Sequence, residues 1–119
     1  LKYNKVLLNN KKQQDLGYQA DLKYHVISDE VARISFILKN KDNNIIDNAK
    51  IKVKFVRPTQ SGFDFKEELF LNKINNSYQN NIIFPLIGLW RVEIQAFIGN
   101  DVFQYVKRIN ITPKPIFNE

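Results

Sequence analysis

The sequence predicts a mainly β protein, a seven-stranded antiparallel immunoglobulin-like β-sandwich with a short N-terminal α-helix. Three observations lead to this prediction. From residue 18 onward, apolar and polar residues alternate with a period of two, which is typical of strands with one buried face. Clusters of Asn, Asp and Gly, which favour turns, separate the alternating runs about every 10 residues. The 119 residues have the length of one domain.

The amino end differs from the rest of the chain because its composition favours a helix. Residues 4–16 are rich in Lys, Gln and Leu and contain neither Gly nor Pro. Gly17 is well placed to end this helix, because glycine readily adopts the left-handed conformation of a C-cap. We therefore expect a helix over residues 1–17, with a narrow apolar face that does not build the core.

Seven alternating runs then follow as candidate strands. Each run places apolar side chains at every second position, so that they share one face. The runs cover residues 22–26, 34–38, 51–55, 63–71, 78–84, 90–96 and 103–111. Pro113 and Pro115 end the last run because proline cannot donate a ladder hydrogen bond. We expect the β domain to span residues 18–112, with residues 113–119 as a C-terminal tail.

The composition argues against several classes of function. The chain has no cysteine, no methionine and a single histidine, His25, so neither a thiol nucleophile nor a preformed copper or zinc site is expected. Glu67 and Glu68 are neighbours on a predicted strand and therefore point to opposite faces. The four glycines form no phosphate-binding motif. We expect no enzyme activity and no bound cofactor.

The net charge of +6 does not predict nucleic-acid binding, because the lysines are not clustered with arginines and aromatic residues. Lys50, Lys52 and Lys54 occupy alternate positions of one predicted strand, and we expect them to form its solvent face. No apolar run approaches the about 20 residues that a membrane-spanning helix needs.

One loop, between the third and fourth runs, is the most promising place for a function. Pro58 ends a strand and Gly62 permits a positive φ, so the loop should have a defined shape. The candidate interaction residues are its polar members Arg57, Thr59, Gln60 and Asp64. Arg57 and Asp64 can pair across the loop. Two interpretations stay open: the pair only braces the loop, or the loop is a docking surface.

The order of several residues in and after this loop resembles the sequence pattern of the FixH family. This family is called CcoH in some organisms and is found beside cytochrome cbb3 oxidase genes. The resemblance lies in Val-Arg-Pro at 56–58, then Asp64, Pro85, Gly88, Trp90 and Val92. The amino end is also similar, with Tyr3-Asn4 and Leu16-Gly17, to the segment that follows a single membrane helix in this family. Trp90 alternates in step with Val92, so we interpret its side chain as part of the core. We interpret Gly88 as a turn residue.

The resemblance implies a non-enzymatic protein that acts in assembly or maturation of a cbb3-type oxidase. It implies an anchor of one N-terminal membrane helix, which this chain lacks, and an immunoglobulin-like domain on the periplasmic face of the inner membrane. Residues 1–17 would then be a juxtamembrane helix, and oxidase subunits or assembly factors would be the partners. Two alternatives stay open: a periplasmic copper-handling module, and a generic immunoglobulin-like domain used in adhesion or secretion.

Overall fold

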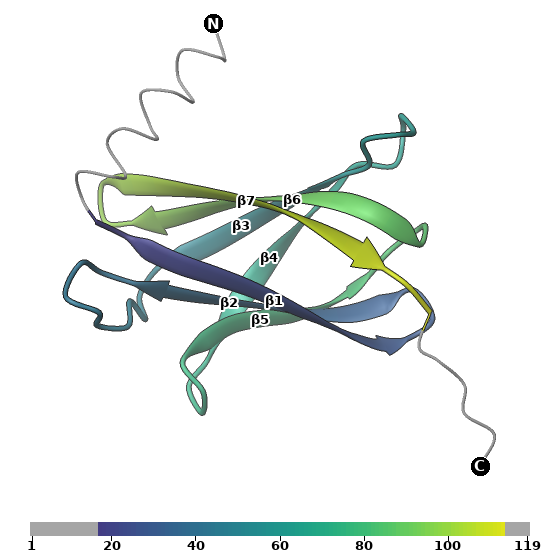
Figure 1. The fold of residues 1–119 in the computed structure, drawn as a ribbon. Helices are drawn as coiled ribbons and strands as arrows, with labels where there is room; N and C mark the ends of the chain where they lie inside the picture. Colours follow the sequence, from purple (N-terminus) through teal and green to yellow (C-terminus); the bar gives the residue numbers. More distant parts are fainter. Residues whose placement is uncertain (1–16, 114–119) are drawn as a thin grey trace, which may run out of the picture.

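The computed structural model describes residues 17–113 and shows a mainly β protein (Figure 1). Its strands are β1 (Gln19–Ser28), β2 (Val31–Lys39), β3 (Lys50–Val56), β4 (Phe65–Asn72), β5 (Ser77–Ile83), β6 (Gly88–Ile98) and β7 (Asp101–Ile111). Each predicted run lies within or overlaps one of these strands, in the predicted order. The helix predicted before Gly17 and the tail predicted after Pro113 lie outside the described residues.

All neighbouring strands are antiparallel, in the hydrogen-bonded order β1-β2-β5-β4-β3-β6-β7. Strand β4 changes partner along its length: residues 65–69 pair with β3 and residues 70–72 pair with β5. Figure 1 shows β4 crossing between a set made of β1, β2 and β5 and a set made of β3, β6 and β7. The prediction of a mainly β fold with seven antiparallel strands is thus confirmed, and β4 joins the two sets of strands into one continuous sheet.

On the side opposite β4, the two end strands β1 and β7 lie side by side (Figure 1), and hydrogen bonds of side chains link them. The Lys107 ammonium donates a hydrogen bond to the carbonyl oxygen of Leu22 at 2.7 Å. The Tyr18 hydroxyl donates to Oδ2 of Asp101 at 3.0 Å. These bonds tie β1, and Tyr18 directly before it, to β7, although the two strands are not neighbours in the hydrogen-bonded order.

The core is a single cluster of apolar side chains from both sets of strands. Its aromatic part gathers Phe55, Phe65, Phe84 and Trp90, with ring centres 4.7–5.7 Å apart. The Trp90 side chain is fully buried, which confirms its interpretation as a core residue. Because Phe55 and Phe65 flank the loop over residues 57–64, the aromatic cluster lies directly under that loop and anchors both of its ends.

Candidate docking site

The loop over residues 57–64 is closed by a bond between its first and last residues. The Asp64 carboxylate accepts the backbone N–H of Arg57, with Oδ1 2.9 Å from the nitrogen. Arg57 and Asp64 therefore do pair across the loop, but the pairing uses a backbone amide and leaves the guanidinium for other partners. Gly62 within the loop has a φ of 89°, a conformation that favours glycine.

The guanidinium of Arg57 connects this loop to the start of β6. Its Nε donates to Oε1 of Gln60 at 3.2 Å, and its Nη1 donates to the carbonyl oxygen of Leu89 at 3.0 Å. The guanidinium carbon lies 5.2 Å from the ring centre of Trp90, which is a cation–π distance. Arg57 thus binds Gln60 within its own loop. It also binds Leu89, which lies 32 residues further along the chain.

Gly88 provides the space that Arg57 occupies. Its φ of 103° is unfavourable for other residues, and a Cβ at this position would lie 3.3 Å from both terminal nitrogens of Arg57. The indole N–H of Trp90 donates to the carbonyl oxygen of Leu86 at 2.9 Å, which fixes the segment before β6. Arg57, Asp64, Gly88 and Trp90, which are dispersed in the sequence, therefore form one contact network.

The outer surface of this network combines polar and apolar groups. Thr59, Gln60 and Asp64 are exposed, as a docking surface would require. Phe63 was predicted in the fourth strand; it lies instead in the loop, and its side chain is 37% exposed. Strand β4 begins only at Phe65, because the Asp64 carboxylate closes the loop. Leu89, whose carbonyl binds Arg57, also exposes its side chain.

Comparison with protein families identifies the relatives of this chain. A family model described as FixH matches residues 1–110, nearly the whole sequence. This chain belongs to the FixH family. The resemblance drawn from residues 56–92 is therefore confirmed, and the contacts of Arg57, Asp64, Gly88 and Trp90 give those residues a structural role in this FixH-family domain.

Two further comparisons concern individual proteins. A search of curated proteins gave no match to this FixH-family chain. A solved structure similar to it is the PKD domain from human VPS10 domain-containing receptor SorCS2, with 12% sequence identity and a TM-score of 0.41. That similarity covers 85% of this chain and 76% of the PKD chain.

The described part of this FixH-family chain offers hydrogen-bonding groups and apolar contacts. Within residues 17–113, no group of three or more His, Cys, Asp or Glu side chains is arranged to hold a metal ion. His25 is exposed on β1. In the same residues, no helix is both long and apolar enough to cross a membrane. Around Arg57, hydrogen-bonding groups of the loop and of Leu89 lie beside the exposed side chains of Phe63 and Leu89.

Sequence reasoning identified four residues of this site and missed two. It placed Arg57, Thr59, Gln60 and Asp64 in one loop, and the structure brings them together. It missed the contribution of Phe63, which the alternation assigned to a strand, and of Leu89, which directly precedes the predicted run over residues 90–96. In the sequence, Phe63 stands between Gly62 and Asp64, two residue types that favour turns, and this signal could have placed Phe63 in the loop.

Proposed function

We propose that this FixH-family chain is a non-enzymatic accessory protein that acts in assembly or maturation of a cbb3-type cytochrome c oxidase through protein–protein contacts. The family match over residues 1–110 is the observation that supports this proposal, because the family occurs beside cbb3 oxidase genes. In the same proposal, a membrane helix before Leu1 tethers the domain to the periplasmic face of the inner membrane. Oxidase subunits or other assembly factors are the partners.

The loop over residues 57–64 is the proposed docking surface. Its shape is held by Asp64 at one end and by the Arg57 guanidinium at the other, so little conformational entropy is lost when a partner binds. Functional residues are commonly carried on loops that a rigid scaffold positions. An exposed aromatic ring, here Phe63, surrounded by polar groups matches the composition of protein interfaces.

A double substitution, Thr59→Arg with Phe63→Ser, tests the loop without removing the bonds of Arg57 or Asp64. We expect the variant to keep its circular dichroism spectrum and thermal midpoint. Docking should weaken by about 1–3 kcal/mol, the range of an interface hot spot, so membranes should contain less assembled oxidase by haem spectrum and oxygen consumption. Ile74→Ser is the matched control, because Ile74 is 95% exposed in the β4–β5 turn, away from the loop.

Two results would separate the parts of this proposal. Normal oxidase levels with the folded double variant would remove the docking role of the loop. Normal oxidase levels in cells that lack the protein altogether would overturn the assembly function itself.

A further inference from the structure

The end of β5, residues 80–83, has a strand partner on one side only. On the side of β2, the pairing continues to the last residue of the strand, with Ile83 opposite Val31. On the other side, the pairing with β4 ends at Gln79, because the earlier part of β4 pairs with β3 instead. Among residues 17–113, no other strand takes this place in the order of the sheet. We call residues 80–83 the open edge.

A side chain marks the point where β4 separates from β5. If the register continued by two positions beyond Phe70 and Gln79, Glu68 would stand opposite Asn81. Instead, the side-chain amide of Asn80 donates to the carbonyl oxygen of Glu68 at 2.9 Å. The Asn80 side chain thus binds the departing backbone of β4, and the two strands do not pair beyond Gln79.

The backbone groups of Asn81 and Ile83 point to the side without a partner. In an antiparallel pair, successive residues direct their N–H and C=O groups alternately to the two sides of the strand. The N–H of Phe84 donates to the carbonyl oxygen of Glu30 at 2.7 Å, in the register that pairs Ile83 with Val31. Phe84 and every second residue before it therefore point toward β2. Asn81 and Ile83, which lie between them, point away from β2.

Two exposed apolar side chains lie beside the open edge. Ile83 is 73% exposed, and Phe70, the β4 residue opposite Gln79, is 60% exposed. Phe70 shares the face of Gln79 because directly opposite residues do, and Gln79 and Ile83 are separated by an even number of positions. A strand added along residues 80–83 would therefore begin next to Phe70 and would place alternate side chains on the face of Ile83. The open edge itself carries no charged residue.

The neighbouring edge of β4 is protected against pairing. Lys66 and Glu67, in the part of β4 that pairs only with β3, are exposed. Glu67 stands opposite the buried Val53, so it is a charged residue on the core-facing side of an edge strand. Edge lysines and inward-pointing charges are features by which native proteins prevent association through strand edges. The open edge of β5 lacks both.

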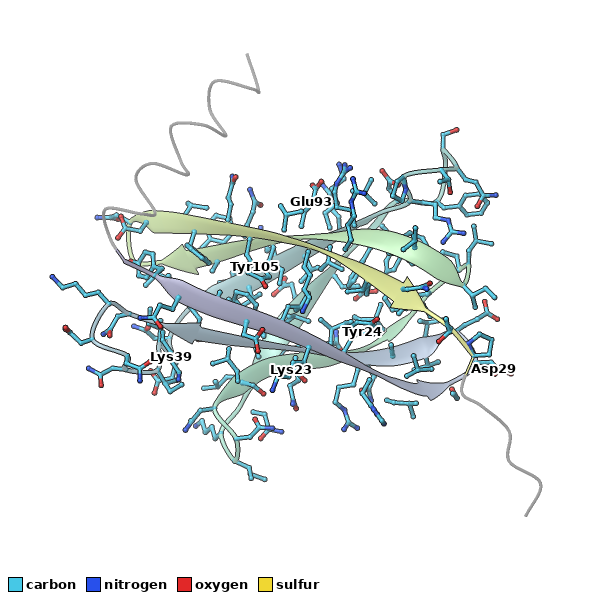
Figure 2. The ribbon with its side chains drawn as sticks, viewed as in Figure 1. Lys23, Tyr24, Asp29, Lys39, Glu93 and Tyr105 are labelled. Atoms are coloured by element: carbon cyan, nitrogen blue, oxygen red, sulfur yellow. The ribbon has the colours of Figure 1, made fainter. Side chains whose placement is uncertain are left out.

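The end strands β1 and β7 are also protected, because side chains fill the space between them. Figure 2 shows Tyr24 and Tyr105 between these two strands. The Tyr24 hydroxyl accepts the N–H of Asn110 on β7, and the Tyr105 ring of β7 lies 5.6 Å from the ring of Phe36 on β2. Within the part of the chain that the structure describes, the open edge of β5 is therefore the edge best suited to accept a strand.

We propose that the open edge binds an extended segment of another protein by β-strand addition. The segment runs antiparallel to β5, and its backbone bonds to the N–H and C=O groups of Asn81 and Ile83. Its alternate, outward side chains are apolar and contact Ile83 and Phe70. Pro85 limits the pairing to about four or five residues, because proline cannot donate a ladder hydrogen bond. This proposal does not rest on the loop over residues 57–64 or on the role in oxidase assembly.

Other occupants fit the open edge less well. A second copy of the chain would bring two molecules of net charge +6 together through only a few paired residues. The segment after β7 contains Pro113 and Pro115, which cannot donate ladder hydrogen bonds. The composition of residues 1–16 favours a helix over a strand.

Amide hydrogen exchange followed by NMR tests the proposal. In the free 119-residue chain, the N–H of Ile83 should exchange at least about tenfold faster than that of Ile82, which points toward β2. The probe is a blocked seven-residue peptide in which three isoleucines alternate with two threonines between terminal lysines. At about 90% saturation, it should slow exchange at Asn81 and Ile83 about tenfold and leave the loop over residues 57–64 unchanged.

Two methylated forms of the peptide separate backbone pairing from apolar contact. The isoleucines share the outward face with Asn81 and Ile83, so their N–H groups face β5. Methylation of two isoleucine nitrogens should therefore weaken binding by at least about tenfold. Methylation of both threonine nitrogens, whose N–H groups face away from β5, should change the affinity by less than about threefold.

Matched variants of the protein assign the binding to this edge. Ile83→Lys introduces a charge of the kind that protects edge strands and should weaken binding by at least about fivefold. Ile74→Lys makes the same change in the β4–β5 turn, at the other end of β5, so its affinity should stay within about twofold. Both positions are exposed, and both variants should keep the circular dichroism spectrum of the wild type.

Three results would overturn the proposal. The first is equal binding of the peptide methylated at isoleucine, which would show that the contact is not strand pairing. The second is slow exchange of Ile83 without peptide, together with dimers in sedimentation, which would mean that a second copy occupies the edge. The third is unchanged exchange of Asn81 and Ile83 at about 5 mM peptide, because specific binding weaker than millimolar is negligible.

Discussion

At the residue scale, Tyr78 shows how one buried hydroxyl fixes a long loop. The Tyr78 side chain is 2% exposed. Its hydroxyl donates to the carbonyl oxygen of Ile46 at 2.8 Å and accepts the N–H of Ala49 at 3.0 Å, both in the loop between β2 and β3. Burial raises the pKa of Tyr78 above its ordinary value, and the charge of Asp47 adds to this effect, while the Ala49 N–H opposes it.

Tyr78→Phe should lower the free energy of unfolding by about 1–3 kcal/mol, because two backbone groups of the loop lose their partner. Since the folded state favours the neutral hydroxyl, this stabilisation is complete below the ordinary tyrosine pKa of about 10 and is lost as pH rises through the higher pKa of the folded state. Urea denaturation between about pH 8 and pH 11 should show the gap between wild type and variant narrowing in the alkaline range. A gap that is constant over this range would contradict the prediction.

At the scale of elements, side chains that bridge the two end strands β1 and β7 cover the exposed edges of the sheet. Lys107 occupies an inward-facing position of β7, where the alternation calls for an apolar residue, and its ammonium reaches the carbonyl oxygen of Leu22 on β1. The backbone N–H of Asn110 donates to the Tyr24 hydroxyl of β1 at 3.4 Å. Exposed strand edges favour association with other chains. Side chains that bridge β1 and β7 therefore help to keep these edges from pairing with another molecule.

Lys107→Met should loosen this side of the molecule without unfolding it. The methionine keeps the apolar stem but cannot donate to Leu22, so opening of β1 should become easier by about 1 kcal/mol. Amide hydrogen exchange followed by NMR should show faster exchange in β1 and β7 and unchanged exchange in β3. Arg108→Met is the control, since Arg108 is exposed on the same strand. Faster exchange throughout the chain would indicate global destabilisation instead.

At the scale of the whole molecule, the aromatic cluster under the loop joins both sets of strands. Phe84 follows β5 and contacts Phe55 of β3 and Trp90 of β6 through ring distances of 5.1 Å and 5.6 Å. Trp90 is the single tryptophan of the chain. Its fluorescence therefore reports on a part of the core to which both sets contribute.

We expect Trp90 fluorescence and far-ultraviolet circular dichroism to show coincident urea transitions, because one core should unfold cooperatively. Phe84→Ala should destabilise the protein by about 3–5 kcal/mol, since Phe84 is fully buried. Phe70→Ala, at a position 60% exposed, should change stability by less than about 0.5 kcal/mol. Separate transitions for the two signals would show instead that the sets unfold independently.

The site illustrates the limit of reasoning from sequence. The positions of Pro58 and Gly62 were sufficient to predict a defined loop with Arg57 and Asp64 in it, because turn chemistry is local. The contacts of Arg57 with Leu89 and Trp90 were not predictable, since they depend on which strands become neighbours. Phe63 was assigned to a strand because alternation alone does not show where a strand begins.

By itself, the sequence determined the seven strands and their buried faces, because alternation and turn residues act over a few neighbouring positions. It also determined the family of the chain. Only the tertiary structure decided that β4 is shared between two sets of strands, that Lys107 bridges β1 and β7, and that Lys66 stands opposite Lys54. These features depend on strand pairing and register. Both are set by contacts between residues far apart in the chain, which no local pattern contains.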